Sequence, residues 1–194
     1  MRLIQQWLVL ALLATLSGCA TLATRASVEV AAAAPVNAIG PDGIACVGTI
    51  PQTLLGLEDA SNDALVAQAL GVWGKGGVCA GRAFTATQPL TVFRVYASVA
   101  TGSMYGRWWS PSRPTGTRDE YRATYAICKA WSTLDRLMSC NVKPGAQIVI
   151  GVTQNVDCDE GAYPKSPSLQ IYVPNDQNTQ TLLVENCVDG GVWP

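Results

Sequence analysis

Six of the seven cysteines of this 194-residue chain stand far apart, at Cys46, Cys79, Cys128, Cys140, Cys158 and Cys187. None of them forms a C-x-x-C pair and the chain contains no histidine, so the ligand spacing of a zinc site is absent. An even number of such cysteines in an exported chain indicates a disulfide framework, with fifteen possible pairings. A first expectation pairs neighbours along the chain, because each bond then closes a modest loop. These pairs are Cys46 with Cys79, Cys128 with Cys140, and Cys158 with Cys187.

The N-terminus has the pattern of an export signal. Arg2 precedes an apolar run over residues 7–16, which is shorter than the roughly 20 residues of a membrane-spanning helix. Leu16-Ser17-Gly18-Cys19 then resembles the lipobox of bacterial lipoproteins. The resemblance implies that residues 1–18 are a cleaved signal peptide and that the Cys19 thiol is lipidated. An ordinary signal peptide that happens to contain a cysteine is the alternative.

The lipobox resemblance also implies a location. Lipoproteins carry a cysteine with several acyl chains such as palmitate, and more than one chain is needed for stable anchoring. Ala20, rather than aspartate, follows Cys19, which resembles the sorting choice for the outer membrane. We therefore expect a lipid anchor in the bacterial cell envelope, at the outer membrane. Residues 19–43, rich in Ala, Thr and Val, are expected to form a flexible tether, and residues 44–194 one exported domain.

Charge is sparse and nearly balanced, with 13 basic and 14 acidic residues. This balance gives no electrostatic case for a nucleic-acid partner. Arginines do gather at Arg107, Arg113, Arg118 and Arg122, where they form either a solvated helix face and loop or an anion site. The acidic segment 157–161 is either a plain loop or an oxygen-rich calcium site, but it lacks the spacing of a known calcium loop. No metal is predicted.

Hydrophobic periodicity predicts helices over residues 57–70 and 118–130, the second opened by a capping box of Thr117 and Glu120. Segments rich in β-branched and aromatic residues predict strands. These segments are 91–99, 146–153, 169–173 and 181–188. Strands outnumber helices and do not alternate with them regularly, so an α+β domain with two main helices is expected rather than a doubly wound sheet.

The inventory of reactive side chains is small. Without histidine, a Ser-His-Asp site, a Cys-His site and a histidine-ligated metal are all excluded. Oxidised cysteines provide no thiol nucleophile. A glycosidase would need two positioned carboxyl groups, and several acids already have structural explanations, such as Glu120 in its cap.

Four segments in a fixed order suggest a different chemistry. Arg94 interrupts an apolar strand, and Tyr105-Gly106-Arg107-Trp108-Trp109-Ser110-Pro111 follows it. Arg122-Ala123 then lies on the capped helix, and Gln170 lies in a late strand that ends in proline. In this order the segments resemble the NAD-consuming toxin domains of the ADP-ribosyltransferase-like superfamily, particularly the tuberculosis necrotizing toxin type of NAD glycohydrolase.

The resemblance implies a fold and a set of roles. The domain would be a single, disulfide-stabilised ADP-ribosyltransferase-like unit with a mainly antiparallel, split sheet. Arg94 would bind the pyrophosphate of NAD, and Gln170 would face the bond that is cut. Further contacts to nicotinamide and phosphate are implied for Trp108, Trp109, Ser110 and Arg122. Cleavage of the N-glycosidic bond passes through an oxocarbenium-like state, so positioning and electrostatics suffice and no cofactor is required beside NAD as substrate.

Departures from the family leave a second class of function open. The transferase Glu-x-Glu pattern is missing, since Ser168 stands two residues before Gln170. Arg94 can equally be a partly buried arginine paired to an acid, and Gln170 the polar face of an edge strand. The alternative is a non-catalytic envelope lipoprotein, an adaptor whose exposed Trp108-Trp109 region binds a protein partner, because aromatic residues and arginine concentrate at interfaces. An inactive descendant of the NAD-consuming family is also compatible with the sequence.

Overall fold

The computed structural model describes residues 38–100 and 102–194. The predicted signal peptide, Cys19 and most of the predicted tether lie outside the described residues. The described residues cluster into one compact unit. None of the helices in the described part of the chain is long and apolar enough to cross a membrane.

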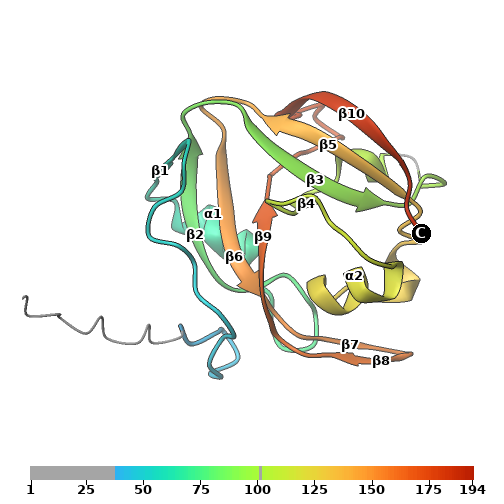
Figure 1. The fold of residues 1–194 in the computed structure, drawn as a ribbon. Helices are drawn as coiled ribbons and strands as arrows, with labels where there is room; N and C mark the ends of the chain where they lie inside the picture. The colour runs from blue at the N-terminus through green and yellow to red at the C-terminus, as the bar shows by residue number, and fades with distance from the viewer. Residues whose placement is uncertain (1–37, 101) are drawn as a thin grey trace, which may run out of the picture. The chain divides into compact units, whose positions relative to one another are not determined.

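The larger sheet has five strands in the order β1-β2-β6-β9-β4, and all its neighbours are antiparallel (Figure 1). The strands are β1 (Leu57–Asp59), β2 (Val78–Ala86), β6 (Gln147–Thr153), β9 (Ser166–Tyr172) and β4 (Trp108–Trp109). The β-branched run of β6 is buried at every position after Gln147. A strand that is apolar on both faces fits a central place in a covered sheet, and β6 occupies that place.

The smaller sheet has three strands, again antiparallel, in the order β10-β5-β3. They are β10 (Val184–Val192), β5 (Arg136–Val142) and β3 (Leu90–Tyr96). A separate hairpin joins β7 (Val156–Cys158) to β8 (Gly161–Tyr163). The observed architecture is therefore α+β with its strands divided over separate antiparallel sheets.

Two α-helices are present among the described residues, and both are shorter than predicted. Helix α1 (Asp63–Ala69) begins at Asn62, whose side chain accepts from Leu65 N at 2.9 Å. The predicted start at residue 57 is wrong, because residues 57–59 pair with β2 instead. Helix α2 (Arg118–Tyr125) has the predicted capping box but ends at Ala126, which is left-handed, with φ of 52°. Residues 127–130 then leave the helix axis, and Lys129–Trp131 forms a single 3₁₀ turn.

The predicted strands are present with shifted ends. The segment 91–99 pairs only as far as Tyr96, and the last strand runs over 184–192 rather than 181–188. β2 and β5 were not predicted. The sequence of β2 is rich in alanine and glycine and that of β5 has one β-branched residue, so both depend on their partners rather than on local preference.

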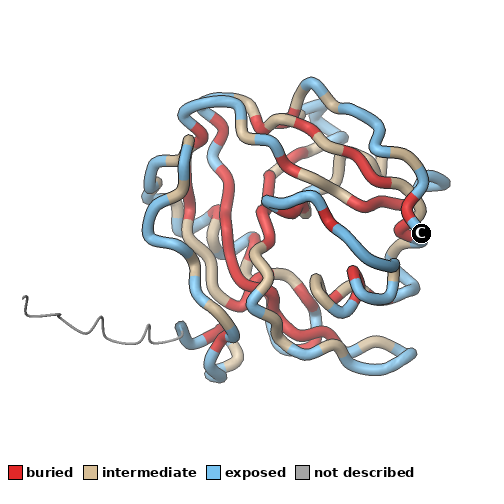
Figure 2. Tube along the Cα trace, viewed as in Figure 1, coloured by how far each residue is buried: buried red, intermediate tan, exposed pale blue. Residues whose placement is uncertain are grey.

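The main core lies between the two sheets, where strands of both contain buried residues (Figure 2). Phe84 of β2, Val92 of β3, Ile148 of β6 and Ile171 of β9 meet there. Trp109 has the largest fully buried side chain. Burial of such side chains contributes about 1.5–3 kcal/mol each, so this layer is the main source of stability.

Three disulfides close the unit, and one of the three expected pairs is confirmed. The bonds join Cys46 with Cys79, Cys128 with Cys158, and Cys140 with Cys187. The expected pairs Cys128 with Cys140 and Cys158 with Cys187 are wrong. β10 lies beside β5, and the irregular stretch between Glu185 and Val188 places Cys187 next to Cys140. Cys128 follows α2 and meets the β7–β8 hairpin, which carries Cys158. Tertiary neighbours, not sequence neighbours, decided both bonds.

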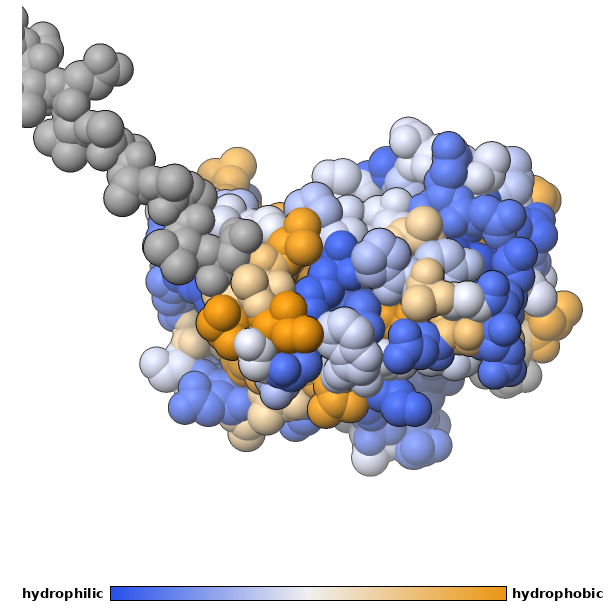
Figure 3. All heavy atoms as spheres, turned by 90° about the horizontal axis from the view of Figure 1, so that it is seen from below, coloured by the Kyte–Doolittle hydropathy of each residue, from blue (hydrophilic) through white to orange (hydrophobic). Residues whose placement is uncertain are grey.

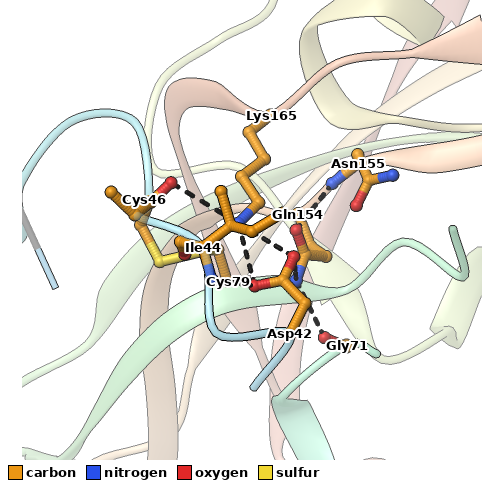
Figure 4. The surroundings of a disulfide bond; sticks show 9 residues. Asp42, Ile44, Cys46, Gly71, Cys79, Gln154, Asn155 and Lys165 are labelled. Carbon is orange, nitrogen blue, oxygen red and sulfur yellow. Dashed lines mark hydrogen bonds and ion pairs between the residues drawn. A yellow bond between two sulfur atoms is a disulfide. The ribbon is translucent and has the colours of Figure 1, made fainter. Parts of the chain in front are cut away.

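The first described residues are fixed to the sheet by a buried ion pair beside the Cys46–Cys79 disulfide (Figure 4). Lys165 Nζ lies 2.9 Å from Asp42 Oδ2, and the two side chains are 7% and 4% exposed. Lys165 also donates to Ile44 O at 3.0 Å. The folded unit therefore starts before the expected boundary at Ile44. Burial raises the pKa of the Asp42 carboxyl, but hydrogen bonds from Lys165 and Ile44 N outweigh burial and lower this pKa overall.

Replacement of Asp42 by asparagine should lower the free energy of unfolding more at about pH 7 than at about pH 3. The pKa of folded Asp42 lies below its ordinary value of 3.8. Its carboxylate therefore stabilises the fold above the unfolded-state pKa, and this contribution is lost as the pH falls through the folded-state pKa. Urea unfolding of both proteins at the two pH values measures the difference.

Asp59→Asn is the matched control for this experiment. Asp59 pairs with Arg82 at 2.6 Å, but its side chain is 67% exposed, and exposed pairs contribute little. Two results would contradict the account of the buried pair. One is that Asp42→Asn and Asp59→Asn lower the free energy of unfolding equally; the other is that the effect of Asp42→Asn does not change with pH.

Candidate functional site

A cavity of about 420 Å³ opens between the glycine-rich loop after α1 and the turn after α2. Its base is formed by Arg94 of β3, Trp108 of β4 and Gln170 of β9. Its walls come from residues 68–72 and 75–77, and from 125–127, 131–132 and 134. Lys75 and Arg94 are the basic residues of the lining, and no described Asp or Glu contributes to it. The sequence from which the cavity is assembled spans about half of the chain, so only the fold brings these residues together.

The glycine-rich loop reaches the cavity because its backbone folds tightly on itself. A Cβ at Gly71 would lie 1.5 Å from Gly76 O, and Gly76 and Gly77 both have positive φ, at 72° and 82°. A side chain is therefore excluded at Gly71, and the two later glycines adopt a conformation that L residues rarely use. The loop brings Lys75 and its own backbone to the mouth of the cavity.

Arg94 carries a positive charge that no acid neutralises. Its Nε donates to Ser103 O at 2.8 Å and its Nη1 to Trp108 O at 2.6 Å. It forms no ion pair with any residue that the structure describes, so the expectation of an acid partner is wrong. Burial lowers the pKa of Arg94, but a guanidinium starts so high that it stays charged at neutral pH. The cavity therefore has a positive base.

The backbone of Gly106 packs against the guanidinium of Arg94, which explains why a glycine stands at this position before the two tryptophans. A Cβ at this position would lie 2.3 Å from Arg94 Nη2. Nη2 donates no hydrogen bond to a described residue, yet it is not a fully buried unpaired atom. Nη2 is therefore the guanidinium amino group that has no partner among the described residues.

The two adjacent tryptophans have opposite environments. Trp108 is half-buried, lines the cavity and packs edge-on against Tyr172, with ring centroids 5.0 Å apart. Trp109 is buried in the main core, where its Nε1 donates to Gly106 O at 2.9 Å. Strand alternation alone produces this difference. Trp109 therefore does not line the cavity, and the pair does not form the exposed surface that a protein-binding adaptor was expected to use.

Gln170 lies at the base of the cavity and is 5% exposed. Its Nε2 donates to Thr153 Oγ1 at 2.9 Å and lies 3.4 Å from Gly77 O and from Tyr125 O. Its Oε1 accepts no hydrogen bond from a described residue, and Gln170 is part of the cavity lining. β9 lies between β6 and β4, but β4 pairs only with Ile171 and Tyr172, so the backbone at Gln170 pairs on the β6 side alone.

Two further predicted residues do not reach the cavity. Ser110 is fully buried, and its Oγ lies 3.2 Å from Phe93 O and 3.1 Å from Ser112 O, the two acceptors for its one hydroxyl proton. Arg122 is 5% exposed, and it donates through Nη1 to Cys128 O at 3.0 Å and through Nη2 to Ser132 O at 2.6 Å. It holds in place the turn that walls the cavity and is not free to bind phosphate.

The remaining arginine and acid clusters have structural roles too. Arg107 donates to Asn175 O and Arg118 to Trp193 O, while Arg113 is exposed. Glu160 accepts from Lys129 N. Within the described ranges, no group of three or more Cys, Asp or Glu residues is arranged to hold a metal ion.

Sequence reasoning missed several residues of the lining. Lys75, Tyr125 and Trp131 contribute to it, and Thr153 fixes the amide of Gln170. Residues 71–77 contain four glycines around Trp73 and Lys75 and directly follow the helix predicted over residues 57–70. A glycine-rich loop that carries a lysine was the signal that could have predicted the cavity mouth.

Comparison with known proteins gives little further information. No protein-family model matches the sequence, and no curated protein matches it. A solved structure of Tne2 in complex with Tni2 is similar over 64% of this chain and 98% of the compared chain, with 15% identity and a TM-score of 0.45. That similarity is too low to establish a common fold.

Replacement of Arg122 by alanine should lower the free energy of unfolding by about 2–4 kcal/mol, because one buried and one partly buried carbonyl oxygen lose their donor. Arg113→Ala is the matched control, since Arg113 is exposed. Urea unfolding measures both variants. If Arg122 were a free phosphate ligand, the two variants would unfold alike.

Proposed function

We propose that this chain is an envelope-anchored lipoprotein with an NAD-consuming domain, in which the cavity over Arg94, Trp108 and Gln170 binds NAD and cleaves its nicotinamide bond. One observation carries the proposal. The two polar residues singled out in apolar strands, Arg94 and Gln170, lie in the same cavity beside an aromatic ring. An ADP-ribosyltransferase-like fold is part of the same proposal, and its sheets of antiparallel strands are compatible with it.

Charge favours an anionic ligand. Arg94 is not neutralised by a carboxylate, Lys75 stands at the mouth, and the lining as described contains no acid. A guanidinium with a free amino group suits a pyrophosphate oxygen. Arg94 would therefore bind the bridge between the two nucleotides.

Shape favours an aromatic ligand. The half-buried ring of Trp108 and the partly buried ring of Tyr125 line the cavity, and flat rings offer stacking or edge contacts to nicotinamide or adenine. The volume of about 420 Å³ lies within the range of small-molecule sites. It suits one half of a dinucleotide, with the other half at the open mouth.

The chemistry does not need the groups that the cavity lacks. The bond between the ribose carbon and the nicotinamide nitrogen breaks, nicotinamide leaves with the bonding electrons, and water adds to the oxocarbenium-like carbon with loss of a proton. Gln170 Oε1 would face this carbon and orient the sugar or the water. Thr153 holds the Gln170 amide in this orientation.

Calorimetry of the oxidised protein with NAD should detect saturable binding, and Arg94→Ala should weaken it. The loss of one charge-assisted contact corresponds to about 1.5–3 kcal/mol. Gln170→Ala should depress turnover more than affinity, because its role is realised at the reacting carbon. Arg94→Lys, which keeps the charge but not the fork, should retain part of the affinity.

Arg82→Ala serves as the control for this experiment, since Arg82 lies outside the cavity and pairs with Asp59 on the surface. Absence of binding at about 1 mM NAD, or equal losses for Arg94→Ala and Arg82→Ala, would contradict the proposed site. Binding without turnover would identify an inactive descendant.

Replacement of Cys19 by serine tests the anchor. The apolar run over residues 7–16 and Leu16-Ser17-Gly18-Cys19 are the basis of this part of the proposal. The variant should lose the acyl mass from the mature protein and leave the membrane fraction. Mass spectrometry and fractionation measure both. An unchanged mature mass together with unchanged membrane partition would show that the chain is not a lipoprotein.

A further inference from the structure

A second surface feature lies at the point where the described chain begins. Ile39, Ile44, Val47 and Trp73 form what we call the N-terminal apolar patch, and their exposed fractions are 65%, 50%, 42% and 52%. Ile44, Val47 and Trp73 line a groove of about 460 Å³, together with Ala162, Tyr163 and Pro164. Ile39 joins them through its bridge to Ala45, which also lines the groove. Figure 3 shows hydrophobic residues gathered on this side of the domain.

Single exposed apolar residues are ordinary, but a gathered set marks a binding surface. This patch is also held rigidly. The Asp42–Lys165 ion pair and the Cys46–Cys79 disulfide hold the segment that carries Ile44 on either side of this residue. Cys46 N also donates to Ala38 O at 2.8 Å. These bonds surround Ile44 (Figure 4). A rigid apolar surface can bind a partner without a large ordering cost.

We propose that the N-terminal apolar patch seats the domain on the surface of the bilayer that holds its lipid anchor. The proposal rests on the lipid anchor proposed above. Eighteen residues separate Cys19 from Ala38, and even fully extended they span only about 65 Å. A domain tethered at that distance meets the bilayer at a high effective concentration. The first residues to emerge from the tether are those of the patch.

The charges around the groove favour apolar contact over attraction to anionic lipid. Lys165 is neutralised by Asp42, and Asp157 adds a negative charge to the lining. A surface with no excess of basic residues gains nothing from anionic headgroups. Trp73 and Tyr163, in contrast, are the residue types that concentrate at the interface between lipid and water. The partner is therefore the interface of a neutral bilayer.

The test uses mature, lipidated full-length protein reconstituted into phosphatidylcholine vesicles that contain lipids brominated close to the headgroup. Bromine quenches tryptophan fluorescence at short range, so Trp73 is expected to be quenched. Trp73→Phe should remove most of the quenched signal. The polar double variant Ile44→Gln with Val47→Gln should also reduce quenching. The ratio of domains in contact with the bilayer to domains out of contact should fall about tenfold. Raising the ionic strength to about 0.5 M should leave the quenching unchanged.

Val188→Gln with Val192→Gln is the matched control. These two side chains are as exposed as the patch, at 62% and 73%, but lie on β10, far from the β7–β8 hairpin in Figure 1. Near-ultraviolet circular dichroism confirms that each variant is folded. The proposed contact with the bilayer is overturned if Trp73→Phe leaves quenching unchanged or if both double variants lower it equally. It is also overturned if sedimentation shows a dimer that the Ile44→Gln with Val47→Gln variant abolishes, because the patch then binds a second copy of the chain.

Failure of the anchor is distinguished by the mass of the mature protein. If the mass shows no acyl chains, the same variants are compared as soluble protein mixed with the vesicles. Cosedimentation that Ile44→Gln with Val47→Gln abolishes then supports the seat without the anchor. Its absence at high lipid concentration overturns the seat.

Discussion

The arrangement of the site depends on three consecutive residues that hydrogen-bond to both sheets. Trp108 and Trp109 pair with β9, and Ser110 exchanges two backbone hydrogen bonds with Phe93 of β3, at 2.9 and 2.7 Å. This segment connects the five-stranded sheet to the three-stranded sheet. Because side chains alternate along it, Trp109 fills the core between the sheets while Trp108 turns to the cavity. The core residue thus fixes the position of the cavity residue beside it.

The segment 108–110 also explains how the Arg94 guanidinium is held in a half-buried position. Arg94 follows Phe93 and donates to Trp108 O, so its stem is held by the strand that joins the sheets. Backbone carbonyls orient the guanidinium without neutralising it, and the absence of a side chain at Gly106 leaves it room. A carboxylate in this place would cancel the charge. The geometry therefore preserves an attraction for anions, and this is the physical basis of the proposed function.

The sequence predicted what local chemistry decides. The capping box of α2 and the β-branched strand β6 were predicted because neighbours in sequence determine them. Arg94 and Gln170 stood out because a polar residue in an apolar strand requires an explanation. What the sequence could not predict depends on tertiary pairing. β2 and β5 take strand form from their partners, the cysteines on β5 and β10 meet because those strands are adjacent, and residues 57–59 join a sheet instead of a helix. The glycine-rich loop became a cavity wall only through the fold.

The most direct test of the central claim is a titration of the isotope-labelled, oxidised protein with NAD, followed by NMR of the tryptophan indoles and glutamine amides. Trp108 and Trp109 are adjacent in sequence, but only Trp108 lines the cavity. The Trp109 indole is therefore an internal control in the same spectrum. The account predicts saturable shifts of the Trp108 indole and the Gln170 amide with one shared dissociation constant, while the Trp109 indole stays in place. Unmoved signals from Trp108 and Gln170 at saturating NAD, or an equal shift of Trp109, would contradict it.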